Sequence, residues 1–223
     1  MAYAFVANRG VQIVGTTAAV TALAATGAGN PLVMFCGWNP NTRNLTGGSD
    51  SKGNAWQVGL SKTALNRSCG WIFCNPTTPL ALGDVVTPTF SSSITSAVGV
   101  LLEFSGGSVQ KDATGSASGV SGTDATATVA ATAGANIGVM CVGSASATNG
   151  NFSPDTGWTR QTGVTHATVN LSMDVYYKIN MAAGLITDLL TGTSADWASS
   201  AGDLMAALSV MGIGELLPMT GAQ

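Results

Sequence analysis

The sequence has few charged residues. Only 9% of its 223 residues are Asp, Glu, Lys or Arg, and the formal net charge is −3. The basic residues are scattered, whereas proteins that bind nucleic acid cluster Lys and Arg against the phosphates. This scarcity argues against a nucleic-acid partner and leaves the surface to uncharged polar residues. Such a surface suits a chain packed against partners or copies of itself, and it is also typical of secreted β-proteins.

Long apolar runs are also missing. No segment reaches the roughly 18 apolar residues that a transmembrane helix requires, so we expect no membrane partner. Residues 1–10 lack the basic start and apolar stretch of a secretory signal. We therefore expect synthesis in a cytoplasm without a signal peptide.

The residue groups that catalysis usually requires are absent. The single histidine, His166, lies in a turn-like stretch, and residues 115–119 carry Ala where a nucleophile elbow has Ser. There are two glutamates, and we expect Glu103 on the solvent-facing side of its strand, so no glycosidase pair stands out. Glycine-rich phosphate-binding loops are absent. We expect a protein that is not an enzyme and has no cofactor.

Cysteine occurs four times, at Cys36, Cys69, Cys74 and Cys141. There is no C-x-x-C pair, and one histidine cannot complete a zinc site of the usual spacing. Cys69 and Cys74 are five residues apart, so one extended strand turns them to opposite faces. We predict free thiols, because the cytosol is reducing.

What the sequence does contain is β-structure. Thr, Val and Gly are abundant, and short apolar runs end at Gly, Asn, Pro or Asp. Residues 98–104 and 169–179 alternate between apolar and polar, which predicts strands with one buried side. Residues 181–190 and 197–208 fit a helix or a strand, and we favour strands. The predicted fold class is all-β, with two tandem jelly-roll-like β-sandwich modules.

The two modules are predicted from an internal repeat. Residues 19–30 are similar to residues 125–136, the pair Val33 and Met34 recurs as Val139 and Met140, and Trp56 recurs as Trp158. The repeat predicts modules at residues 1–107 and 108–223, joined by a Gly/Ser-rich linker within residues 105–122. There are two alternatives. The similarity is a chance result of the biased composition, or both halves share a single core and the junction is a crossover connection within it.

Two long polar loops, residues 39–54 and 143–157, lie at equivalent places just before the paired tryptophans. Long loops often carry function. The candidate partner or glycan contacts are Trp56, Trp158, Asp50, Asn54, Asn151 and Asp155, because aromatic faces can stack on sugars. The alternative for the tryptophans is a packing role. Weak calcium binding through Asp50, Asn54 or Asp155 is a further hypothesis.

The order of these segments resembles that of virion structural proteins of tailed bacteriophages. The resemblance rests on residues 1–8 (MAYAFVAN), the apolar strand at 32–38, Gly157 with Trp158, the aromatic strand at 175–178 and Phe-Ser-Gly at 104–106. It covers nearly the whole chain with generic motifs. Two positions depart from this pattern. The first copy has Ala55 in place of Gly before Trp56, and the second copy ends in Leu-Ser-Val from Leu208 in place of Phe-Ser-Gly.

The resemblance implies a non-enzymatic virion protein, most simply a capsid decoration, cement or accessory head protein. Its partners would be the major capsid protein or other virion proteins, and it would form a homo-oligomer or multi-copy assembly. A candidate docking tail holds Ile213, Leu216, Leu217 and Met219, and the alternative is a tail folded back on its own domain. The alternative function is a tail- or fibre-associated glycan-binding adhesin module, and a hydrolase is a third hypothesis.

Overall fold

The computed structural model of the protein is built from β-strands, with one short 3-10 turn among the residues it describes. It describes residues 2–12, 15–40, 42–64, 67–131, 136–146, 148, 152–154, 156–181 and 184–206. The predicted all-β fold class is confirmed. The strands before residue 107 are β1 (Ala4–Gln12), β2 (Val20–Thr21), β3 (Leu32–Asn39), β4 (Leu45–Asp50), β5 (Gln57–Ala64), β6 (Arg67–Cys74), β7 (Val85–Phe90) and β8 (Ser96–Ser105). Those after it are β9 (Val109–Ala131), β10 (Asn136–Ser144), β11 (Phe152–Pro154), β12 (Thr159–His166), β13 (Leu171–Ile179) and β14 (Gly184–Ala206), with the turn at Ala167–Val169.

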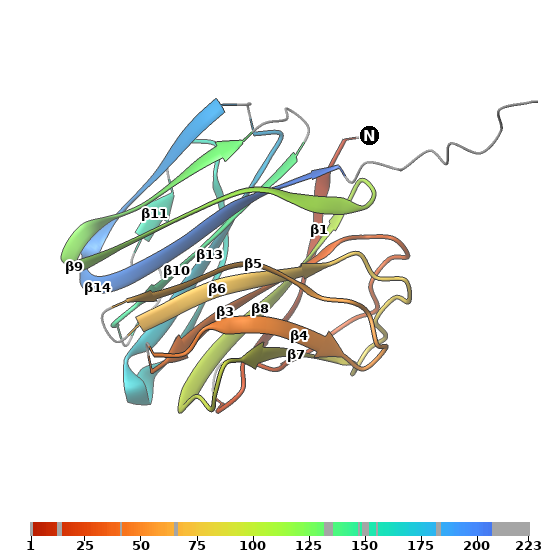
Figure 1. Cartoon of the computed structure of the whole chain (residues 1–223), viewed down its shortest axis with the longest axis horizontal. Helices are drawn as coiled ribbons and strands as arrows, with labels where there is room; N and C mark the ends of the chain where they lie inside the picture. The colour runs from red at the N-terminus through yellow and green to blue at the C-terminus, as the bar shows by residue number, and fades with distance from the viewer. Residues whose placement is uncertain are drawn as a thin grey trace, which may run out of the picture.

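The strands form three antiparallel sheets that stack in layers (Figure 1). We call the sheet with the order β1-β8-β3-β6-β5 the first sheet. The second sheet has the order β11-β14-β10-β13-β12, with β9 also paired to β14. The small sheet has the order β2-β7-β4. In Figure 1, β3 to β8 of the first half, orange to yellow-green, lie below most strands of the second half, green to blue.

The two halves repeat one strand order. The first half has β1-β8-β3-β6-β5 with β2-β7-β4, and the second has β9-β14-β10-β13-β12 with β9-β14-β11. The register shift between Val58 and Leu60 in β5 recurs between Arg160 and Thr162 in β12. An internal duplication would produce this correspondence and an eight-stranded double sheet in each half, as in a jelly roll. The duplication itself stays a prediction.

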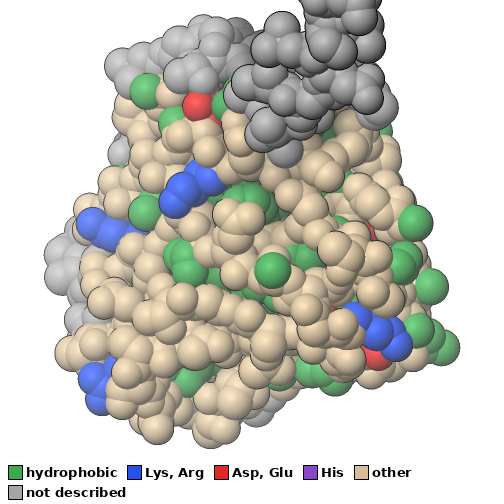
Figure 2. Space-filling view, turned by 45° about the vertical axis from the view of Figure 1, so that its right-hand side comes forward, with side chains coloured by type: hydrophobic (Ala, Val, Ile, Leu, Met, Phe, Trp, Pro, Cys, Tyr) green, Lys and Arg blue, Asp and Glu red, His purple; other side chains and the backbone are tan. Residues whose placement is uncertain are grey.

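The surface matches the composition. Figure 2 shows a face on which uncharged polar side chains and backbone dominate, with a few separate basic side chains. Most large apolar side chains of the described residues are buried instead. These buried side chains pack on both faces of the first sheet, because the second sheet covers one face and the small sheet covers the other.

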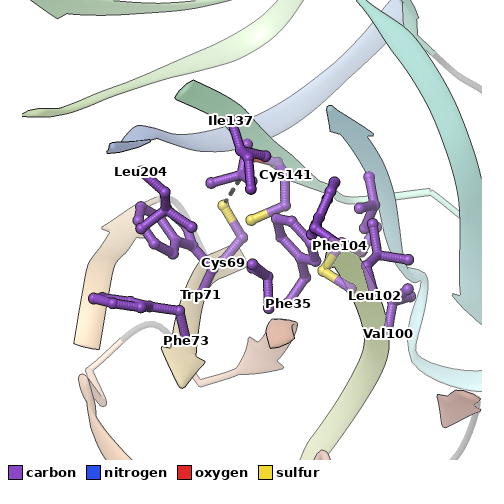
Figure 3. Close-up of a cluster of buried hydrophobic side chains, with 14 of the residues drawn as sticks. Phe35, Cys69, Trp71, Phe73, Val100, Leu102, Phe104, Ile137, Cys141 and Leu204 are labelled. Atoms are coloured by element: carbon purple, nitrogen blue, oxygen red, sulfur yellow. Dashed lines mark hydrogen bonds between the residues drawn. The ribbon is translucent and has the colours of Figure 1, made fainter. Parts of the chain in front are cut away.

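The inner faces of the first and second sheets share one hydrophobic core (Figure 3). Phe35, Trp71 and Phe104 enter it from the first half, and Ile137 and Leu204 enter it from the second. The predicted boundary between residues 107 and 108 falls between β8 and β9, in the turn that joins the two sheets. The division into two modules stays a prediction, and the shared core argues that both halves fold together.

Glycines allow this close approach of the sheets at reciprocal positions. A Cβ at Gly37 in β3 would lie 3.4 Å from the Cβ of Met173 in β13, and a Cβ at Gly143 in β10 would lie 3.3 Å from the Cβ of Cys69 in β6. The contact β3 with β13 is thus mirrored by β10 with β6. Two copies related by a two-fold axis would make such reciprocal contacts.

Each large sheet is also covered on its outer face. The small sheet covers the first sheet through a second cluster that includes Leu101 and Val86. The second sheet folds over itself, so that β11 and the parts of β9 and β14 near it cover the outer face of β10 and β13, through a cluster that includes Tyr176 and Phe152. Pairing between β9 and β14 shifts register between Thr191 and Trp197, and the ribbon bends there (Figure 1). Central strands are therefore buried on both faces.

Several local predictions change in this arrangement. The predicted linker at 105–122 is mostly the first part of β9, because the Gly/Ser-rich chain pairs along β14. The predicted loops at 39–54 and 143–157 contain the short strands β4 and β11. Of the ambiguous segments 181–190 and 197–208, residues 184–190 and 197–206 belong to β14, as favoured. No helix in the described ranges is long and apolar enough to cross a membrane.

Candidate functional site

The polar candidates of the first half form an internal bracket at the end of β4. The carboxylate of Asp50 accepts hydrogen bonds from the backbone of Lys52 and Asn54 at 2.8 and 3.1 Å, and from the Trp56 indole at 2.9 Å. The side chain of Asn54 is buried and pairs with the backbone of Thr78 at 2.9 and 3.1 Å. Burial raises the pKa of Asp50, but the hydrogen bonds from Asn54 and Trp56 outweigh it and leave the pKa below its ordinary value. The bracket holds a loop in place.

The paired tryptophans occupy packing positions. Trp56 is 9% exposed and packs in the cluster under the small sheet, and Trp158 is 6% exposed and packs in the cluster under β11. A sugar ring needs an open aromatic face, so this burial favours the packing role that the sequence left open. Asn151 and Asp155 lie outside the described residues, and the glycan site built on these six residues stays a prediction.

The alternation of β8 predicted that Glu103 faces solvent, and this prediction is wrong. Glu103 is fully buried, because the loop that precedes β3 covers the outer face of β8. Its carboxylate pairs with Arg9 and accepts hydrogen bonds from the Gly27 backbone at 2.7 Å and the Asn30 amide at 2.6 Å. The carboxylate thus joins β1, β8 and the loop into one unit.

The polar face of β13 is likewise closed, although alternation predicted an open side. Asp174 is buried and accepts hydrogen bonds from Arg160 of β12 at 2.6 and 3.0 Å. Tyr176 is buried under β11 and donates its hydroxyl to the Phe152 carbonyl at 2.7 Å. Burial raises the pKa of Tyr176, the nearby Asp174 charge raises it further, and Arg160 opposes both.

The four cysteines are free and buried, as predicted. Cys69 and Cys74 face opposite sides of β6, since the first lies in the shared core and the second in the outer cluster. Figure 3 shows Cys69 and Cys141 inside the core, where the Cys69 thiol donates to the Ala198 carbonyl at 3.1 Å. Burial raises the pKa of Cys74 to about 12, and the Asp50 charge adds to this. Burial also raises the pKa of Cys36 and of Cys141. Buried protonated thiols are poor nucleophiles.

His166 ends β12 just before the 3-10 turn, with its Nδ1 buried and without a hydrogen-bond partner. A single imidazole without an acid or nucleophile bonded to it gives no acid–base pair. No group of three His, Cys, Asp or Glu side chains that could hold a metal occurs among the described residues.

Two surface features were missed by sequence reasoning. One is a shallow hollow of about 440 Å³ between the β1–β2 and β7–β8 connections. Phe90, Pro88 and Ile94 give it apolar walls, and its hydroxyls come from Thr16, Thr17, Thr89, Ser92 and Ser93. The other is the exposure of four large apolar side chains, which belong to Val6, Val11, Leu23 and Leu82. Both depend on connections that the strand pattern does not place.

The predicted docking tail with Ile213, Leu216, Leu217 and Met219 lies outside the described residues. Comparison of the chain with protein-family models, curated proteins and solved structures finds no match. The buried carboxylates of Glu103 and Asp174 bond to neighbouring segments of the same chain, so they stabilise the fold.

Proposed function

We propose that the protein is a non-enzymatic structural component of a tailed-phage virion, most simply a capsid decoration, cement or accessory head protein. One observation carries the proposal: the half-buried Asp50 and the buried Glu103 and Asp174 are each bonded within the scaffold. Catalysis instead requires acid and base groups that converge on an accessible cleft. The resemblance of the segment order to virion proteins supplies the biological setting.

The architecture supports this role. Three stacked sheets, the second of which folds over itself, give a scaffold with three hydrophobic clusters. A low charge reduces repulsion between close copies. The proposed partners are the major capsid protein or other virion proteins.

Quantitative mass spectrometry of purified particles tests the proposal. We expect the protein at a fixed number of copies relative to the major capsid protein, through repeated density-gradient steps. A soluble protein of the infected cell serves as the carry-over control and should fall at each step. A chain that falls in parallel with this control would refute the virion assignment.

A second candidate, glycan binding, is favoured by the hydroxyl-lined hollow. Neutral hydroxyls beside the Phe90 side chain are chemically suited to a neutral saccharide, and pockets of this size hold small ligands. We expect glycan-array signal to be lost in Thr17→Val and Ser92→Ala and kept in Lys52→Ala, which lies away from the hollow. No array signal for the wild-type chain would eliminate this candidate.

A further inference from the structure

Two of the four buried cysteines meet between the sheets. Cys69 of β6 and Cys141 of β10 belong to the cluster that the two halves share, and neither is exposed. The Cys69 thiol lies 3.5 Å from the Cys141 carbonyl, and the Cys141 thiol lies 3.6 Å from the carbonyl of Gly70, the residue after Cys69. Figure 3 shows both sulfur atoms in the same part of the core. Each thiol therefore rests against the strand that carries the other.

Two further observations place the side chains in contact. Burial raises the pKa of Cys141 most, and a hydrogen bond with the Cys69 side chain raises it further. The strands also approach closely here, because Gly143 of β10 has no side chain and a Cβ at that position would lie 3.3 Å from the Cys69 Cβ. A disulfide requires such a close approach of two backbones.

The other two cysteines are not placed to pair. Cys36 and Cys74 lie on the outer face of the first sheet, in the cluster under the small sheet. Cys36 is opposite Gly70 in the register of β3 with β6, and Cys74 is 74 − 70 = 4 residues further along β6, which is about 13 Å at about 3.3 Å per residue. The first sheet itself separates both from Cys69. The contact of Cys69 with Cys141 is therefore specific among the four.

Packing alone does not account for two thiols at this place. The reciprocal contact around Gly37 has Phe35 and Met173 at the positions that Cys141 and Cys69 occupy around Gly143, as the strand registers show. Apolar side chains fill the core at that contact, where they are not adjacent thiols. The thiol pair thus adds a chemistry that the reciprocal contact lacks.

We propose that Cys69 and Cys141 form a disulfide when the protein meets a low-molecular-weight disulfide, such as oxidised glutathione, outside a reducing cytosol. The bond ties β6 to β10, and so ties one half of the molecule to the other. This inference goes beyond the proposed function and does not depend on it.

The reaction is a thiol–disulfide exchange in two steps. The Cys69 thiolate attacks oxidised glutathione, breaks its S–S bond, forms a mixed disulfide and releases one glutathione thiolate. The Cys141 thiolate then attacks the protein sulfur of the mixed disulfide, forms the bond to Cys69 and displaces the second glutathione. The pair loses two protons and two electrons, and one oxidised glutathione becomes two reduced molecules.

Burial controls when these steps occur. Glutathione cannot reach the thiols in the closed core, so the first step needs a transient separation of the two sheets. A glutathione adduct is too large for a close-packed interior, so closure of the sheets favours the second step, which expels it. The product closes a loop of 141 − 69 = 72 residues, and a cross-link over so long a loop strongly restricts the unfolded chain.

Oxidation of the purified full chain tests the proposal. The protein is incubated with oxidised glutathione in urea below its unfolding midpoint, alkylated, and digested without reduction by chymotrypsin, which cuts after Trp71 and Phe73 and so separates Cys69 from Cys74. We expect loss of two of the four free thiols and one linked peptide pair, Cys69 with Cys141. Four remaining thiols, glutathione adducts without the cross-link, or a link through another cysteine would overturn the proposal.

Variants then test what the bond does. Cys141→Ala removes one partner, and Cys36→Ala is the matched control, because both delete a fully buried thiol. We expect oxidation to raise the urea midpoint of the wild type and of Cys36→Ala, and to leave that of Cys141→Ala unchanged. A rise in Cys141→Ala, or no rise in cross-linked wild type, would contradict a bond between the halves. If Cys141→Ala does not fold, the peptide map of the wild type still decides. Absence of the protein from purified particles would refute only the virion assignment.

Discussion

A single buried side chain, Glu103, connects three parts of the first half. Strand alternation alone places it opposite the apolar side of β8, and that part of the prediction is correct. The error concerns what covers this face, since a loop from much earlier in the chain closes over it. A buried carboxylate is stable only with a complete set of donors.

We therefore expect Glu103→Gln to lower the free energy of unfolding by roughly 3 kcal/mol, because the amide places a donor against donors and leaves Arg9 unpaired. Urea unfolding followed by tryptophan fluorescence measures this change. Lys52→Ala is the control, since its ion pair with Asp84 is partly exposed to solvent and contributes less than about 1 kcal/mol. Equal losses in the two variants would contradict the role assigned to Glu103.

The buried thiols predict instability at high pH. Burial raises the pKa of Cys74 to about 12, and it also raises the pKa of Cys36 and Cys141. The folded state then holds its thiol protons more tightly than the unfolded chain, whose thiols ionise near pH 8.5. The stabilisation is complete below about pH 8.5 and is lost as the pH rises toward 12. Each thiol accounts for about 1.4 kcal/mol per pH unit.

Urea midpoints at pH 7.5, 9.0 and 10.0 check this dependence. We expect the midpoint to fall from pH 9.0 to 10.0, and to fall less steeply in Cys74→Ala. A midpoint that stays constant across this range would show that the thiols are not protected by burial.

At the scale of the strands, packing between sheets depends on small residues. A Cβ at Gly202 in β14 would overlap the Trp71 indole across the shared core. We expect Gly202→Ala to destabilise the protein by about 1–3 kcal/mol, because the sheets must move apart or the indole must leave its rotamer. Gly47→Ala is the matched control, since nothing lies within 4 Å of a Cβ there, and its change should stay within about 0.5 kcal/mol. Thermal unfolding of both variants decides the point.

Strand positions were largely readable from the sequence, because alternation and turn residues are local signals. The predicted strands at 98–104 and 32–38 lie within β8 and β3. The Gly/Ser-rich residues 109–122 were read as a linker, because their strand state depends on pairing with distant β14. The same limit applies to the candidate sites. Local sequence shows which residues are polar, whereas the bracket at Asp50 depends on contacts between segments.

At the scale of the whole molecule, the shared core predicts one cooperative unit. We expect a single urea transition in which fluorescence and circular dichroism coincide. A chain of residues 1–107 should lack a cooperative transition and bind a hydrophobic dye, because the inner face of its first sheet is uncovered. Cooperative unfolding of that fragment would instead support two independent modules.

The same inner face has a consequence during synthesis. When residue 107 has left the ribosome, the apolar side of the first sheet still waits for its cover. About a hundred more residues must be translated, which takes on the order of 5–20 s at about 5–20 residues per second. Nascent chains of this length are therefore the stage at which chaperones should bind, and at which overproduction should generate inclusion bodies.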